Sequence, residues 1–411
     1  MAKLVVLPCE DYSKEHVSAC VDSIFADFGD AEAFLVKGKN IFIKANLVTD
    51  LPPERHGTTH PMLVECIARR LVEAGARVVV GDSSGGAYTR AYMNNIYRVT
   101  GMTEACKASG AELNDDFGFS TVDLKGKVNR HQEIIDVFLK ADAVINVCKL
   151  KTHGFTGYSC AVKNLYGLIP GLVKAEVHSK YPELDDFCDN LIDIERFASE
   201  KILLHVVDGV IGMEGEGPTN GTPRFVGKII ACDDAYITDV AAVKLFDEPS
   251  KMPLLLKAVE RGLLNSDFGA SCVDYSECEK AYIEDFKRVS VLHALFNKRG
   301  FLRRFLRKEW VTRKPVIKKS VCRGCEKCFR HCPRQAIEMK SDKSTQKKRA
   351  FIHSKQCIRC YCCQELCPFN AVKLKKPFLY IFIQSYARFV GFQKQKNEKT
   401  GIKTKELIIL D

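Results

Sequence analysis

Two short segments of this 411-residue chain repeat one dense pattern of cysteines. The first, VCRGCEKCFRHCP, covers residues 321–333, and the second, QCIRCYCCQELCP, covers residues 356–368. In each segment four cysteines follow one another at intervals of three, three and four residues, and a proline comes directly after the last. Nine of the 19 cysteines of the chain lie in these two segments. The pattern C-x2-C-x2-C-x3-C-P is typical of segments that bind iron–sulfur clusters.

The spacing follows from the shape of a cubane cluster, which needs one thiolate on each of its four irons. Three cysteines in a tight loop can hold three corners, and the fourth corner is reached by the Cys-Pro segment of the other motif. We therefore predict two [4Fe-4S] clusters. The ligands of the first cluster would be Cys322, Cys325, Cys328 and Cys367. The ligands of the second would be Cys357, Cys360, Cys363 and Cys332.

Two other uses of these thiols are less favoured. Zinc sites usually pair two short knuckles across a longer spacer, whereas each segment here packs three cysteines and ends in Cys-Pro. Disulfides are opposed by the reducing compartment inferred below. Cys362, beside Cys363, is the ninth cysteine and is predicted not to be a ligand, although an exchange of roles between these two neighbours stays open.

The module at about 316–375 resembles the bacterial two-cluster ferredoxins, and the resemblance implies two clusters close enough to exchange electrons. It departs from them in the basic insert KSDKSTQKKRA between the two motifs. Positive charge near a cluster favours the reduced state, which is the more negative one, and should raise its potential.

The other ten cysteines are scattered between Cys9 and Cys278 without a framework spacing. No signal peptide is recognisable at the N-terminus, and no run of 18 apolar residues occurs. Scattered cysteines in a large chain without a secretion signal indicate a reducing compartment, so we expect a cytoplasmic protein.

Residues 1–284 alternate apolar strand-like runs with helical patterns. Strands are expected at 3–8, 40–45, 76–82, 142–147, 202–208 and 227–233. The clearest helix is THPMLVECIARRLVEAGA, which has Pro61 in its first turn and Gly75 just past its end. This alternation predicts an α/β domain with a mainly parallel sheet.

Polar and charged residues follow several of these strands. At the shared edge of a parallel sheet they would form a site for an anion such as a carboxylate or a phosphate. The predicted substrate-binding residues are Lys44, Asn46, Asp82, Lys151, Asn164, Asp208 and Glu214. The predicted catalytic residues are His153, Lys149 and Lys163. His153 would act as an acid or base, or with His178 as a metal ligand. For any one of these residues alone, a solvated loop charge or a packing role is the alternative.

The segments IKANL, VVGDS, INVCKLKTH, AVKNLYGLIPG and VVDGVIGMEGEGPTNG resemble the uncharacterised domain of unknown function 362, which often accompanies ferredoxin modules. The resemblance covers roughly residues 3–250. It implies no activity, because the family has none established. Asn146 and Gly217 are matching positions besides the site residues named above. No GxGxxG opens a helix after the first strand and no Walker A motif occurs. The stretch SSGGAY after Asp82 is a candidate phosphate loop, but a plain turn is favoured.

Two flanking segments are expected to be separate from both domains. Residues 285–315 form a basic linker or docking helix, and residues 376–411 an apolar and then basic tail. From Lys287 to Ser320 there are twelve Lys or Arg and one acid, Glu309. These segments would dock the two domains together or contact a redox partner protein or an anionic membrane surface, and nucleic acid is the least favoured partner.

Three functions fit these observations. The leading hypothesis is an oxidoreductase, or its electron-input subunit, that acts on a small anionic substrate. The second is a non-enzymatic electron carrier or adaptor whose large domain recognises a partner protein. The third is an assembly factor for clusters or metallocofactors.

Overall fold

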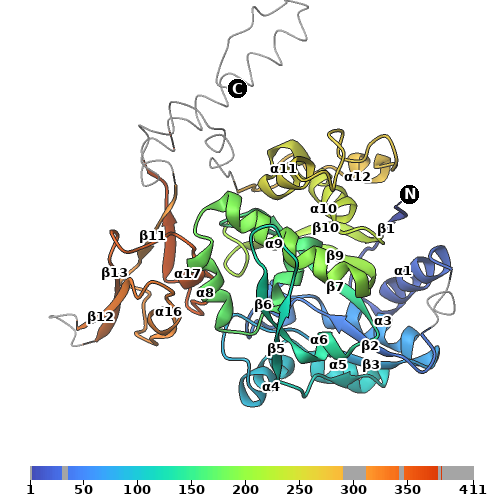
Figure 1. Cartoon of the computed structure of the whole chain (residues 1–411), viewed down its shortest axis with the longest axis horizontal. Helices are drawn as coiled ribbons and strands as arrows, with labels where there is room; N and C mark the ends of the chain where they lie inside the picture. The colour runs from blue at the N-terminus through green and yellow to red at the C-terminus, as the bar shows by residue number, and fades with distance from the viewer. Residues whose placement is uncertain (1, 30–35, 290–311, 342–346, 378–380, 382–411) are drawn as a thin grey trace, which may run out of the picture. The chain divides into compact units, whose positions relative to one another are not determined.

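The computed structural model describes residues 2–29, 36–289, 312–341, 347–377 and 381 (Figure 1). The chain divides into two compact units, the first essentially Met1–Val289 and the second most of Ser290–Asp411. Most of the predicted basic linker and of the C-terminal tail lies outside the described residues. In the part of the chain that is described, no helix is both long and apolar enough to cross a membrane.

The first unit is built on an eight-stranded sheet in which β1, β10, β9, β7, β2, β3 and β4 lie in that order and β8 pairs with β7. The strands are β1 (Leu4–Pro8), β2 (Asn40–Lys44), β3 (Arg77–Gly81), β4 (Glu112–Leu113), β7 (Ala143–His153), β8 (Gly157–Ser159), β9 (Ile202–Glu214) and β10 (Thr222–Cys232). The pairs from β4 through β3, β2 and β7 to β9 are parallel, and β10 pairs antiparallel with β9 and β1. A separate ribbon pairs β5 (Phe119–Asp123) with β6 (His131–Ile135). The predicted α/β class with a mainly parallel sheet is confirmed.

Helices surround the sheet (Figure 1). They are α1 (Lys14–Asp27), α3 (Pro61–Glu73), α4 (Arg90–Val99), α5 (Met102–Ser109), α6 (Asp136–Lys140), α7 (Ala161–Asn164), α8 (Val173–Lys180), α9 (Leu184–Ala198), α10 (Ala235–Lys244), α11 (Pro253–Glu260) and α12 (Ser276–Lys280). Single 3-10 turns are η1 (Pro53–Arg55), η2 (Leu165–Leu168), η3 (Ser199–Lys201) and η4 (Pro249–Lys251). The predicted helix is α3, which has Pro61 at its first turn and is capped by the His60 side chain.

Alternate residues of β2 serve different purposes. Ile41 and Ile43 belong to the apolar core that α1 and α3 share with the sheet. The ammonium group of Lys44 instead lies against Gly167 of η2, where an added Cβ would be 2.5 Å from Nζ. Because successive side chains of a strand point to opposite faces, β2 presents its charged residue on the face away from this core.

Two strands are longer than the sequence patterns predicted. We expected them to end at residues 147 and 208, but β7 continues to His153 and β9 to Glu214. The extension is stabilised by pairing, since the end of β7 is hydrogen-bonded to β8 and the end of β9 to β10. Several polar residues that we placed in loops after the strands are therefore strand residues.

The second unit is small and twofold repeated. Strand β11 (Lys314–Ile317) pairs with β14 (Val372–Lys375), and β12 (Ile337–Ser341) pairs with β13 (Lys348–Ile352). The short helices α16 (Lys327–Arg330) and α17 (Cys362–Glu365) occupy equivalent places in the two halves. The basic insert of the sequence belongs to the β12–β13 hairpin, and its residues 342–346 lie outside the described part.

Candidate functional site

The two cysteine motifs have the same backbone conformation. Left-handed residues occur in pairs 35 positions apart, which are Gly324 and Arg359, Glu326 and Tyr361, and Gln335 and Asn370. The cysteines Cys322 and Cys357 that open the two motifs are separated by the same interval. A left-handed conformation is uncommon outside glycine, so its repetition marks two loops of one shape.

Four thiols come together around the first loop. Burial, and then the neighbouring thiols of Cys367, Cys322 and Cys325, raise the pKa of Cys328 to about 12. They are the same four residues that the motif spacing predicted as ligands of one cluster, and their assignment as ligands stays a prediction. Neighbouring thiolates repel one another, and a positively charged iron–sulfur core would compensate that repulsion. This donor set therefore fits a [4Fe-4S] cluster.

The second loop contains the additional cysteine. Cys362 is buried, and its pKa is raised well above its ordinary value by the side-chain hydrogen bond with Cys360 and by burial. In the repeat, Cys362 stands where the first half has Lys327, and Cys363 stands where the first half has the predicted ligand Cys328. This correspondence supports Cys363 as the ligand.

No three His, Cys, Asp or Glu side chains in the described ranges are arranged to hold a single metal ion. His178, which we considered as a metal ligand beside His153, is stacked on Phe187 with ring centroids 4.5 Å apart.

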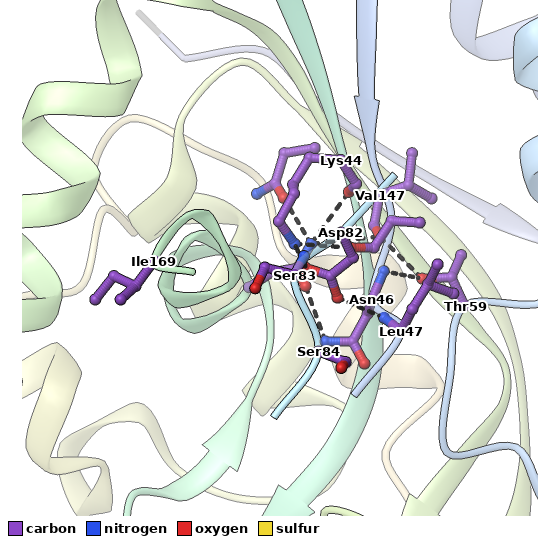
Figure 2. Close-up of polar contacts among 12 residues, drawn as sticks. Lys44, Asn46, Leu47, Thr59, Asp82, Ser83, Ser84, Val147 and Ile169 are labelled. Atoms are coloured by element: carbon purple, nitrogen blue, oxygen red, sulfur yellow. Dashed lines mark hydrogen bonds and ion pairs between the residues drawn. The ribbon is translucent and has the colours of Figure 1, made fainter. Parts of the chain in front are cut away.

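At the carboxyl end of β2 and β3, Lys44 and Asp82 form a buried ion pair with 2.6 Å between Nζ and Oδ1 (Figure 2). Asp82 also accepts hydrogen bonds from the backbone N–H groups of Leu47 and Ser83. Burial lowers the pKa of Lys44, while Asp82 raises it. Gly167 lies directly on the pair, since a Cβ there would be 2.3 Å from Asp82 Oδ1.

A chain of amides connects neighbouring elements at this edge. Asn46 Nδ2 donates to Asn164 Oδ1 at 2.8 Å, and Asn164 Nδ2 donates to Asn146 Oδ1 at 2.8 Å. Asn146 Nδ2 lies 2.8 Å from Nδ1 of His205, which is its partner across the β7–β9 pairing. Because the amide is the donor, that imidazole nitrogen carries no proton. Burial lowers the pKa of His205 to about 3.

A second ion pair joins β7 and β9. Lys149 and Asp208 are register partners, and Lys149 Nζ is 2.9 Å from Asp208 Oδ2 with both side chains fully buried. Tyr12 donates to Asp208 Oδ1 at 2.6 Å and accepts from Lys149 at 2.8 Å. The His60 ring is stacked on Tyr12 with centroids 3.6 Å apart. Burial lowers the pKa of His60 to about 4, and the nearby Lys149 also lowers it.

The remaining predicted lysines differ in their surroundings. Lys151 is buried and donates to Asn46 Oδ1 at 2.7 Å and to the carbonyl of Gly57 at 2.9 Å. Lys163 is half-buried, with Nζ 5.6 Å from the centre of the Tyr166 ring. The structure thus brings Lys44, Asn46, Asp82, Lys151 and Asn164 into one connected region.

His153 and Glu214 stand at the far ends of the two long strands. His153 Nδ1 accepts from the backbone N–H groups of Phe155 and Thr156, so it organises the turn that leads to β8. Glu214 is buried, and its carboxylate binds the backbone N–H and the ammonium group of Lys287.

Four residues of this region escaped the sequence interpretation: Tyr12, His60, Lys174 and His205. Lys174 donates to the hydroxyl of Ser83 at 2.9 Å and to its carbonyl at 2.8 Å, inside the stretch that we considered as a phosphate loop. Burial lowers the pKa of Lys174 to about 7. A single Tyr, His or Lys gives no periodic signal, so only the folded chain identifies these four.

Comparison with known proteins agrees with this division of the chain. Residues 41–244 match the family model described as a domain of unknown function (DUF362), and residues 321–371 match a 4Fe-4S dicluster domain. This chain carries a DUF362 domain joined to a 4Fe-4S dicluster domain. Both resemblances inferred from the sequence are confirmed, and so is the capacity to bind 4Fe-4S clusters.

Individual relatives are more distant. A thylakoid-associated protein of Synechocystis sp. is 26% identical over 289 residues, which is 70% of this chain and 88% of that protein. The lactate racemase apoprotein of Thermoanaerobacterium thermosaccharolyticum is 12% identical, with a TM-score of 0.38 over 58% of this chain and 55% of that one. A Thermotoga maritima protein is 13% identical, with a TM-score of 0.31 over 53% of this chain and 55% of that one. This chain spans about half the length of either solved structure.

Proposed function

We propose that this DUF362 protein transfers electrons through two [4Fe-4S] clusters and is an oxidoreductase, or the electron-input subunit of one, that acts on a small anionic substrate. The bound clusters would supply single electrons. The DUF362 domain would bind the substrate at the carboxyl edge of β2, β3 and β7. We also propose a cytoplasmic location, which the absence of any disulfide among the 19 cysteines supports.

The observation that carries this proposal is the buried polar network of the DUF362 domain. Two ion pairs, Lys44–Asp82 and Lys149–Asp208, are withdrawn from water. Buried charges are costly, and perturbed titratable groups gather at functional sites more often than elsewhere. The network also lies where open α/β sheets bind ligands.

We propose different roles for the lysines that form ion pairs and for Lys163. Lys44 and Lys149 are neutralised by their carboxylates, so we propose that they hold the shape of the site. The half-buried Lys163, which directly precedes Asn164 in α7, would then meet the anionic group of the substrate. A charge-assisted hydrogen bond of this kind contributes about 1.5–3 kcal/mol, which is more than tenfold in affinity.

The test is to reduce the cluster-loaded protein, screen small carboxylates and phosphates for those that reoxidise the clusters, and repeat the assay with Lys163→Met. Lys180→Met is the matched control, because that lysine also lies over a tyrosine ring, 5.2 Å from its centre. We expect Lys163→Met alone to lose at least tenfold in apparent affinity for the active anion. If no anion reoxidises the clusters, or if both variants equal the wild type, the substrate site is wrong.

The complete burial of two of these lysines favours a second function. The side chains of Lys44 and Lys149 are 0% exposed. If the network serves only to stabilise the domain, the protein is an electron carrier or adaptor whose DUF362 domain recognises a partner protein. Co-purification of one stoichiometric partner with the cluster-loaded chain, in the absence of any turnover, would support this second function.

A further inference from the structure

The predicted ligands of the two clusters differ in their exposure to solvent. Cys325, a predicted ligand of the first cluster, is exposed. The seven other predicted ligands are all half-buried. Because electron transfer between proteins slows steeply with distance, a cluster held next to the surface is the better exchange point for an external partner.

Two aromatic side chains flank the same ligand set. Phe329 follows Cys328 directly in α16, and Phe369 comes two residues after Cys367. Cys328 and Cys367 are predicted ligands of the same cluster, so both rings follow ligands of the first cluster in the sequence. Each phenylalanine is 43% exposed. Large apolar side chains that stay exposed beside a reactive group are typical of the centre of a protein interface.

The module that carries these phenylalanines is strongly basic. The described residues 312–341 and 347–377 contain seventeen Lys or Arg and three acids. Arg323 and Arg330 are exposed within the first motif, and the side chain of Arg330 is 70% exposed. Arg330 is paired with Glu326 at 2.9 Å, so the excess positive charge comes mainly from the other lysines and arginines of this module. A basic module that exposes apolar side chains favours a partner of the opposite sign and accelerates its approach.

We propose that an acidic electron-carrier protein docks on Phe329, Phe369, Arg323 and Arg330, which we call the port surface, and exchanges electrons with the cluster of Cys322, Cys325, Cys328 and Cys367. One electron passes from the reduced group of the partner to the oxidised cluster, and no covalent bond forms or breaks. The inference rests on the proposed electron-transfer function and adds the point of entry and the kind of partner.

The experiment uses the cluster-loaded full-length chain and an acidic flavodoxin as the probe. Calorimetry measures the Kd for oxidised flavodoxin, and stopped-flow absorbance measures cluster reduction by its hydroquinone. We expect the Kd to rise at least tenfold between roughly 20 and 300 mM salt, because screening shortens the reach of surface charges. Phe329→Ala and the double variant Arg323→Glu/Arg330→Glu should each raise the Kd at least tenfold at low salt.

The matched controls come from the same domain. Phe351 of β13 is also 43% exposed, and Lys340 Nζ lies 4.4 Å from the centre of its ring. Phe351→Ala and Lys340→Glu should leave both the Kd and the reduction rate unchanged within twofold. Equal losses in the control and port variants would overturn the proposal, because the binding would then depend on general basic charge alone.

Two further outcomes separate the alternatives. If phosphatidylserine vesicles bind the wild type but not the port variants, while flavodoxin binds all of them equally, the surface is a membrane contact and the proposal is overturned. If dithionite reduces the clusters but flavodoxin neither binds nor reduces them, only the docking inference fails. Clusters that dithionite also leaves oxidised would overturn the electron-transfer function itself.

Discussion

At the level of single residues, the DUF362 domain buries two of its lysines against carboxylates, Lys44 against Asp82 and Lys149 against Asp208. Lys149 is typical, because its ammonium group has a carboxylate at 2.9 Å and a tyrosine hydroxyl at 2.8 Å. Burial lowers the pKa of Lys149, and Asp208 opposes that shift. Removing one member of such a pair leaves the other charged without a partner or a hydration shell.

Lys149→Met should therefore lower the free energy of unfolding by about 3–5 kcal/mol, because Asp208 keeps a buried, uncompensated charge. Urea denaturation followed by circular dichroism measures the loss. The double variant Lys149→Met/Asp208→Asn should recover much of it, since no charge is then stranded. Single and double variants of equal stability would show that the pair is not buried in solution.

The neutral imidazole of His205 should make the stability depend on pH. Its pKa falls from 6.5 to about 3 on folding, so between these values the unfolded chain binds a proton that the folded chain does not. The contribution of His205 to the free energy of unfolding is complete above pH 6.5. It decreases as the pH falls below that value, by about 1.4 kcal/mol per pH unit. Wild type and His205→Gln, compared by urea denaturation from pH 7 to 4, should differ in slope by this amount. Parallel curves would contradict the assignment.

At the level of elements, the dicluster domain is a duplicated loop and helix. In each half a left-handed residue, Glu326 or Tyr361, precedes a four-residue helix, α16 or α17. The second residue of each helix is a predicted ligand. The additional cysteine, Cys362, is the first residue of α17 and has Lys327 as its counterpart.

Cys363→Ala should therefore lose one cluster, whereas Cys362→Ala, its immediate neighbour, should keep both. Anaerobic iron and sulfide analysis should give about eight of each per chain for the wild type and for Cys362→Ala, and about four for Cys363→Ala. Electron paramagnetic resonance of the reduced protein checks that the surviving cluster is a [4Fe-4S] cluster. Loss of iron from Cys362→Ala alone would reverse the two assignments.

At the level of the whole molecule, the two units depend on different sources of stability. The core shared by the sheet, α1 and α3 of the DUF362 domain is large and apolar, and all of its residues precede residue 232. The dicluster domain has a few short strands and two one-turn helices. Small domains of this kind usually need metal to fold.

Removing iron with a chelator should consequently unfold one unit and spare the other. We expect the thermal transition of the DUF362 domain to move by less than about 3 °C, while the residues around the cysteine motifs become susceptible to protease. Circular dichroism and limited proteolysis with mass spectrometry measure the two effects. Loss of both units at the same chelator concentration would show that their folding is coupled.

The sequence by itself determined the elements that depend on local spacing. Intervals between the cysteines predicted 4Fe-4S binding, because a cubane fixes the geometry of its ligands. Alternating apolar runs predicted the α/β sheet, and Pro61 and Gly75 bounded α3. These signals are local, since each is set by residues a few positions apart.

The tertiary structure decided which polar residues are buried and which partners they bind. The sequence predicted strand ends at residues 147 and 208, but pairing of β7 with β8 and β9 holds Lys149 and Lys151 in a strand, and β9 continues past Asp208. No local pattern reveals that Lys149 faces Asp208 across 59 positions, or that Tyr12 and His60 close around them. Burial and partner choice arise only when distant segments meet. The sequence therefore identified which residues carry charge, and the fold decided which of those charges are neutralised inside the protein.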